Sequence, residues 1–254
     1  MQTPVMGAPM LSEKKPALIA PWWHTALLIG ILVAASAGQS QTLGQTVARF
    51  GRLPLYISTM FLEWTLVGFI WMAIKRRGIA VRQLVGGKWS TVEDFLMDLA
   101  IAGGFWIVSA GVIAGVRVAM GNLSLHAADN AKQLEEVKRT IGFLAPHGTA
   151  ETLLYICVTL TAGFCEELIF RGYLQKQFER WSGSVAVGIL VQAALFGAAH
   201  GYQGVKMMIA LAVFGGLFGM LAAWRKSLRP GMIAHTWQDL ASGLLLRTIL
   251  ERAK

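Results

Sequence analysis

Two acidic residues and an arginine interrupt an apolar run at residues 165–175, which read CEELIFRGYLQ. On a helix, Glu167 and Arg171 are four residues apart and share a face, so they can form an ion pair. Glu166 is rotated by about 100° from Glu167 and cannot share that arrangement equally well. The spacing therefore predicts one carboxylate with a structural role and one that is free to do chemistry.

Two further apolar runs carry polar groups that need a partner or a purpose. His200 closes FGAAH at 196–200, and His235 and Asp239 lie four residues apart in HTWQD at 235–239. Inside a membrane each unpaired charge costs about 2.5–3.5 kcal/mol even on lenient insertion scales. Two histidines, three acids and an arginine in three separate runs therefore indicate an active or a transport site.

Several kinds of chemistry suit this set of side chains. A carboxylate near imidazole can hold a water and remove its proton, and a second imidazole can donate to a developing oxyanion. A glutamate and two histidines are also a zinc ligand set. Hydrolysis of a peptide bond within the membrane fits either version. A proton-coupled transporter uses similar residues but often shows two related halves, which this sequence lacks.

The remaining polar residues of the apolar runs are expected to be structural. Glu63, in FLEWTL, is expected to pair with an arginine elsewhere in the chain. His24, His126 and His147 lie at run ends or in loops and are expected to be ordinary surface residues.

Composition predicts an all-α, polytopic membrane protein. The 254 residues are 55% hydrophobic and only 15% charged, whereas soluble domains average about 25% charged. The net charge of +9 comes without a run of five basic residues or a basic–aromatic pattern, which argues against nucleic acid as a partner. Apolar runs predict seven spans, at 22–38, 53–74, 94–118, 152–174, 185–200, 206–224 and 231–249. The less apolar stretch 119–150 is the place where an eighth span could hide.

Basic residues predict how the chain is oriented. They concentrate in 75–93, 175–184 and 224–230, which share a side with the N-terminus if the seven spans are right. The positive-inside rule places that side in the cytoplasm. The first apolar run ends in Ala-Ser-Ala, as a cleavable signal would, but the membrane runs that follow favour an uncleaved span. We expect a cytoplasmic segment (1–21), N-terminal membrane helices and loops (22–149) and a catalytic membrane core (150–254).

Taken together, the motifs resemble those of the CPBP family. The order is E-E-x-x-x-R followed by F-R-G (Glu166 to Gly172), then F-x-x-x-H ending at His200, then H-x-x-x-[ND] from His235 to Asp239. This family comprises CAAX prenyl endopeptidases of the Ras-converting type and bacterial relatives linked to bacteriocin processing and immunity. The resemblance covers roughly residues 150–246 and rests on three ordered motifs in three apolar runs.

The resemblance implies an intramembrane protease of about eight helices around a polar cavity. By this likeness Glu166 is the general base that activates water, and His200 helps to hold that water. His235 and Asp239 complete the oxyanion side, and Glu167 with Arg171 forms the supporting pair. The glutamate mechanism needs no cofactor. A catalytically silent scaffold of the same family is the alternative in which these residues are retained without turnover.

One position departs from the family pattern. Many members have Asn where this chain has Asp239, and an ionised carboxylate cannot donate a hydrogen bond to an oxyanion. Asp239 must then be protonated, orient His235, or bind a metal. If it binds a metal, the alternative is a zinc ion held by His200, His235 and Asp239.

The expected partners are the lipid bilayer of the cell (inner) membrane and a peptide or protein substrate. Bacterial peptides or membrane-protein tails are favoured over prenylated proteins.

Overall fold

The chain folds into a bundle of helices. The computed structural model describes residues 17–121 and 142–252, and in these two ranges there is no strand. The predicted all-α membrane bundle is therefore confirmed. In chain order the helices are α1 (Trp22–Phe50), α2 (Leu53–Lys75), α3 (Val81–Val85), α4 (Val92–Ala119), η1 (Gly142–Leu144), α6 (Gly148–Glu166), η2 (Glu167–Gln175), α7 (Lys176–Ser182), α8 (Val185–Ala199), η3 (Gly201–Gln203), α9 (Val205–Arg225) and α10 (Arg229–Arg252).

Helices occupy all seven of the predicted apolar runs. Four of them are long and apolar enough to cross a membrane: α2, α4, α9 and the continuous helix formed by α6, η2 and α7. The first sixteen residues of α1 and the whole of α8 are apolar but shorter. The helix α10, which occupies the run predicted at 231–249, belongs to neither group. Most of the stretch predicted to hide an eighth span, residues 122–141, lies outside the described residues.

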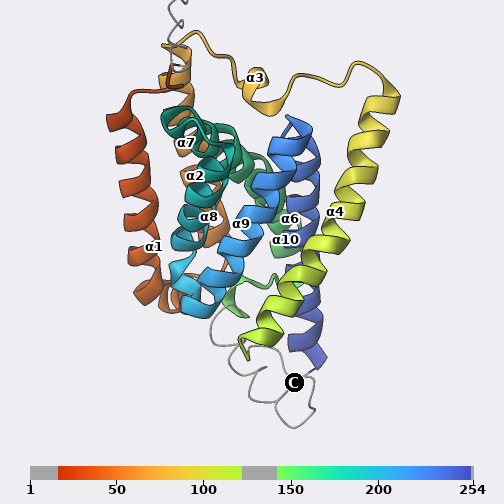
Figure 1. The fold of residues 1–254 in the computed structure, drawn as a ribbon. Helices are drawn as coiled ribbons and strands as arrows, with labels where there is room; N and C mark the ends of the chain where they lie inside the picture. Colours follow the sequence, from red (N-terminus) through yellow and green to blue (C-terminus); the bar gives the residue numbers. More distant parts are fainter. Residues whose placement is uncertain (1–16, 122–141, 253–254) are drawn as a thin grey trace, which may run out of the picture.

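The helices are arranged so that α1 and α4 flank a central group (Figure 1). Within that group α8 and α9 form an antiparallel hairpin, while α6 packs against both α2 and α10. The outer faces of the bundle carry large exposed apolar side chains, among them Trp22, Phe61 and Ile107. Such exposed apolar side chains suit contact with lipid, since several of the helices that carry them are long and apolar enough to cross a membrane.

The basic segments gather at one end of the bundle, the upper end in Figure 1. Lys176 Nζ donates to the Leu84 carbonyl at 3.0 Å, and Arg180 Nη1 donates to the Ala17 carbonyl at 3.0 Å. These contacts join α7 to α3 and to the segment before α1. The prediction that the basic segments share one side is therefore confirmed, whereas the cytoplasmic identity of that side stays a prediction.

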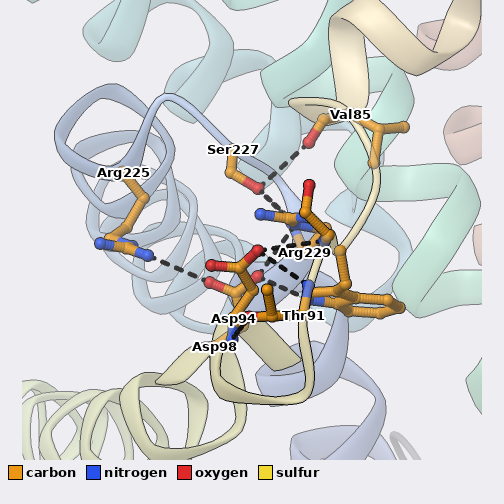
Figure 2. A network of polar contacts seen from close by, with 9 residues as sticks. Val85, Thr91, Asp94, Asp98, Arg225, Ser227 and Arg229 are labelled. Carbon is orange, nitrogen blue, oxygen red and sulfur yellow. Dashed lines mark hydrogen bonds and ion pairs between the residues drawn. The ribbon is translucent and has the colours of Figure 1, made fainter. Parts of the chain in front are cut away.

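A buried carboxylate fixes the first turns of α4 to the turn between α9 and α10 (Figure 2). Asp98 is fully buried and lies 3.2 Å from Arg225 Nη2 and 2.9 Å from Arg229 Nε. Trp89 Nε1 donates to the same carboxylate at 2.9 Å. A buried charge is tolerated only when it is paired and hydrogen-bonded, and here two arginines and an indole satisfy one acid.

The α9–α10 turn also contacts the end of α3. Leu228 N donates to the Val85 carbonyl at 2.9 Å, and the Ser227 hydroxyl donates to the same oxygen at 3.2 Å. Gly86 follows with φ +98, and a Cβ there would lie 2.6 Å from the Ser227 Cα. Only glycine combines this left-handed backbone with so close an approach, so Gly86 lets the two turns touch.

One expectation about the histidines is wrong. His24 is buried rather than on the surface, because both ring nitrogens have partners inside the bundle. Nδ1 lies 3.0 Å from the Tyr173 hydroxyl, and Nε2 lies 3.0 Å from the Phe69 carbonyl oxygen. The ring ties α1 to α2 and η2. His126 lies outside the described residues.

Candidate active site

The two adjacent glutamates lie in different surroundings. Arg171 Nη1 is 2.9 Å from Glu167 Oε1, and the two side chains are 0% and 1% exposed. The ion pair predicted from their spacing is therefore confirmed. The Glu166 side chain is 17% exposed and does not take part in that pair. The bundle thus presents Glu166 to an incoming group and keeps Glu167 out of reach.

Arg171 is enclosed by aromatic rings and backbone. Its guanidinium carbon lies 4.5 Å from the centre of the Phe196 ring and 5.2 Å from that of Phe218. Nη2 donates to the Gly215 carbonyl on α9 at 3.4 Å. Cation–π contacts of this kind become stronger when the cation is desolvated, so the rings help to keep a full charge inside the bundle.

The helix changes its winding directly after Glu166. Residues Glu167–Gln175 form a π-helix, and all nine are buried. Stretches of π-helix are rare and occur frequently at functional sites. The α-helix predicted for 152–174 is therefore interrupted by a π-helical segment and extends further than expected, to Ser182.

His235 on α10 is held by the same carboxylate that binds Arg171. Its Nδ1 donates to Glu167 Oε1 at 3.0 Å, so one oxygen serves a guanidinium and an imidazole. The contact depends on close packing of α6 against α10. A Cβ on Gly163 would overlap Thr236 Oγ1 and lie 2.9 Å from the Met232 carbonyl oxygen.

Glu166 lies between two imidazoles. Its Oε1 is 4.0 Å from His200 Nε2, and its Oε2 is 3.6 Å from His235 Nε2. His200 Nδ1 donates to the Phe196 carbonyl at 2.9 Å, which fixes the ring and turns Nε2 toward the glutamate. Both separations exceed an ordinary hydrogen bond of about 2.7–3.2 Å. Neither imidazole is therefore hydrogen-bonded directly to Glu166.

Asp239 completes the group, and its side chain is more exposed than those of Glu166 and His200. Its Oδ2 lies 3.7 Å from His235 Nε2, and its side chain is 36% exposed. The Tyr155 hydroxyl donates to the Asp239 backbone carbonyl at 2.9 Å, which fixes this turn of α10 against α6. All six residues predicted from the sequence therefore lie in one contiguous group drawn from α6, η2, α10 and the residue that ends α8.

The described residues do not form a metal site. Across 17–121 and 142–252, no three His, Cys, Asp or Glu side chains are grouped in a way that could hold a metal ion. This includes the set proposed for zinc, His200, His235 and Asp239. The residues present do not fit the metal, so we derive no step through one.

Two residues near the site were not predicted to belong to it. Glu63 on α2 is buried, and its Oε2 has no hydrogen-bond partner. No arginine pairs with it within the described ranges. Tyr202 in η3 accepts a hydrogen bond from Gln203 Nε2 at 3.0 Å. Burial raises the pKa of the Tyr202 hydroxyl to about 12, with smaller contributions from the nearby carboxylates. Its phenol therefore stays neutral and able to donate.

Fold and site together define a helical membrane protein with an acid–imidazole centre. Residues 148–241 match one protein family, described as type II CAAX prenyl endopeptidase Rce1-like. The matched segment begins at the first residue of α6, ends within α10 and contains all six predicted residues. It supports a CPBP-family intramembrane protease, as the three motifs predicted. No curated protein and no solved structure matches the chain.

Proposed function

We propose that this protein is an intramembrane endopeptidase in which Glu166 activates water to hydrolyse peptide bonds. The observation that carries the proposal is the position of Glu166, partly exposed and facing two imidazole nitrogens at 4.0 and 3.6 Å. The similarity of residues 148–241 to CAAX prenyl endopeptidases supports the same class of reaction.

In this mechanism the water lies between Glu166 and His200. A water bridging the 4.0 Å gap can give one proton to the carboxylate and direct its other proton to His200 Nε2. Glu166 takes the first proton as the water oxygen attacks the scissile carbonyl carbon. The C–N bond then breaks, and the protonated Glu166 passes that proton to the leaving amine. The carboxylate is restored and no proton is left over.

The developing oxyanion is stabilised from α10. His235 donates through Nδ1 to Glu167, which leaves Nε2 directed toward the reacting centre. A protonated imidazole donates from both nitrogens, so His235 in that form supplies one donor to the oxyanion. Asp239 supports it, either as a neutral acid that donates or as the group that orients the ring.

Glu167 and Arg171 position the site without touching the substrate. Their burial excludes direct contact with an incoming peptide, while the shared Oε1 fixes the His235 ring. Catalytic geometry has to be held within a fraction of an ångström by such supporting groups.

We assign the catalytic core to residues 150–254, and we place the N-terminus and the basic end of the bundle on the cytoplasmic side of a cell (inner) membrane. The substrates are peptides or protein tails at the bilayer, prenylated ones included.

The test compares Glu166→Gln with the wild type in membranes of cells that express each protein. Gln keeps the shape of the side chain and removes the base, so new peptide termini made by the wild type should be absent from the variant. The folded protein should be retained, as judged by its thermal unfolding in detergent. Glu179→Gln, on the same continuous helix but away from the site, is the matched control and should cleave normally. Near-normal cleavage by Glu166→Gln contradicts the general-base role.

A further inference from the structure

The helix formed by α6 and η2 packs against α10 in one antiparallel register. At the glycines of this seam an added Cβ would come up against the opposite helix, and near the end of α10 an arginine donates across it. Paired across the seam are Glu167 with Gly231, Gly163 with Thr236, Tyr155 with Gly243 and Thr152 with Arg247. The register matters for the site, because the acidic pair stands on one side of the seam and His235 with Asp239 on the other.

Tyr155 makes the contact of the seam that lies next to Asp239. Its hydroxyl donates to the main-chain carbonyl of Asp239 at 2.9 Å. In an α-helix that carbonyl also accepts from the amide four residues on, which is that of Gly243, and its two lone pairs allow both bonds. A Cβ on Gly243 would overlap the Tyr155 hydroxyl and ring. The missing side chain of Gly243 therefore lets the phenol reach the carbonyl.

The Asp239 side chain is held less firmly than its neighbour His235. The His235 ring is fixed by the bond from its Nδ1 to Glu167 Oε1 at 3.0 Å. Asp239 Oδ2 is 3.7 Å from His235 Nε2, and the side chain is 36% exposed. That distance is longer than a hydrogen bond. The place of the Asp239 carboxyl therefore depends on the main chain that carries it, and Tyr155 holds that main chain.

A second tyrosine matches Tyr155 in every respect except this contact. The Tyr56 ring on α2 packs against the Tyr155 ring, with centres 5.6 Å apart. Its hydroxyl also donates to a main-chain carbonyl, that of Leu144 at 2.7 Å. Leu144 lies in η1, which carries none of the site residues. Each phenol thus ties its helix to another segment, but only the Tyr155 phenol is bonded to a residue of the site.

We propose that Tyr155 is a positioning residue of the active site: its bond to the Asp239 carbonyl fixes where the Asp239 carboxyl stands beside His235. This inference rests on the proposed function, in which Asp239 supports His235 as the donor to the oxyanion. The oxyanion exists only after water has attacked. A displaced Asp239 therefore weakens binding of the transition state and leaves binding of the peptide unchanged.

Tyr155→Phe and Tyr56→Phe form a matched pair that tests this role. Each removes one hydroxyl and keeps its ring, so thermal unfolding in detergent should show a similar loss of stability in both. The probe is a fluorogenic peptide that spans a cleavage site found in wild-type membranes. Tyr155→Phe should lower kcat by about three- to tenfold with KM nearly unchanged. Tyr56→Phe should keep the wild-type kcat. Equal kcat values for the two variants overturn the proposal.

A second comparison asks whether Tyr155 acts through Asp239. Asp239→Ala removes the carboxyl and keeps the main-chain carbonyl. Adding Tyr155→Phe to it should change the remaining kcat by less than about 1.5-fold, while the loss of stability stays as large as in the wild type. In Asp239→Asn, which keeps a polar side chain of the same size, Tyr155→Phe should again lower kcat. A loss of kcat in Asp239→Ala as large as in the wild type overturns the role.

Glu166→Gln, assayed alongside, separates this inference from the proposed function. If Glu166→Gln is active, the protease mechanism fails. If Glu166→Gln is inactive while Tyr155→Phe keeps the wild-type kcat, the mechanism stands and the role of Tyr155 is overturned. If Asp239→Ala shows no turnover of its own, the Asp239→Asn background decides, and a kcat there that Tyr155→Phe leaves unchanged overturns the proposal.

Discussion

Replacing Arg171 by Met should destabilise the protein strongly, because it leaves Glu167 as a buried charge without its cation. Both side chains are essentially inaccessible and their nearest atoms are 2.9 Å apart. Removing one partner of a buried pair costs about 3–5 kcal/mol. His235 Nδ1 still donates to Glu167 Oε1 at 3.0 Å, and a bond to a charged acceptor retains about 1.5–3 kcal/mol. We therefore expect a loss near the lower limit, about 3 kcal/mol.

The double variant Glu167→Gln/Arg171→Met distinguishes the stranded charge from lost packing. It removes both charges, and a buried pair replaced by neutral groups of similar volume is often close to neutral in stability. The double variant should therefore be more stable than Arg171→Met alone, with a coupling free energy of at least about 2 kcal/mol. Met also fills part of the space between Phe196 and Phe218, so little of the loss comes from a cavity.

The double-mutant cycle compares the wild type, Glu167→Gln, Arg171→Met and the double variant. The free energy of unfolding of each purified protein is measured in detergent by circular dichroism or tryptophan fluorescence. Arg180→Met is the matched control. Arg180 Nη1 donates to a backbone carbonyl in an exposed contact, so its loss should change stability by no more than about 0.5 kcal/mol. Additive single effects, or a cost for Arg171→Met no larger than for Arg180→Met, would refute the buried-pair reasoning.

Three further predictions concern sidedness, Asp239 and helix packing. Cysteines introduced in 75–93 and 224–230 should resist an impermeant reagent added to whole cells, and labelling of either segment from outside would reverse the orientation. Asp239→Asn should retain activity and resist chelators, since Asn offers a donor; a loss of orders of magnitude that chelation reproduces and zinc reverses would favour a metal site. Gly163→Ala should cost about 1–3 kcal/mol and lower turnover by separating α6 from α10. Gly104→Ala, where nothing lies within 4 Å of the new methyl group, should be neutral or stabilising by up to about 1 kcal/mol, and equal effects would contradict the packing explanation.

Hydropathy was enough to locate the long helices, because each apolar run must satisfy its backbone within one helix. The run predicted at 53–74 became a helix over Leu53–Lys75, and 185–200 became Val185–Ala199. The first run did less well. Its apolar part ends near residue 38, but α1 continues to Phe50. Hydropathy shows where the chain leaves the apolar layer. The helix itself ends where the backbone leaves helical geometry, here at Gly51 with φ +78.

The site was predictable where it depends on spacing along one helix. Glu167 and Arg171 meet because they are four residues apart, and that rule needs no tertiary structure. The bond from His235 to Glu167 joins residues 68 positions apart and depends on the close packing at Gly163. Glu63 was misassigned for the same reason. An isolated acid in an apolar run shows that a partner is needed, but only the packed helices show that no arginine of the described residues supplies it.

The Asp98 cluster has a consequence for how the chain is inserted. Asp98 stands on α4, while Arg225 and Arg229 stand on either side of the α9–α10 turn. The contacts form only when the start of α4 and that turn emerge on the same side of the bilayer. A chain with α4 inverted would leave the acid unpaired in the apolar phase, at a cost of about 2.5–3.5 kcal/mol. The two arginines thus have two roles. They act first as basic residues beside the α9–α10 turn that direct insertion, and later as the ion-pair partners of Asp98. Those ion pairs form only in a correctly inserted chain.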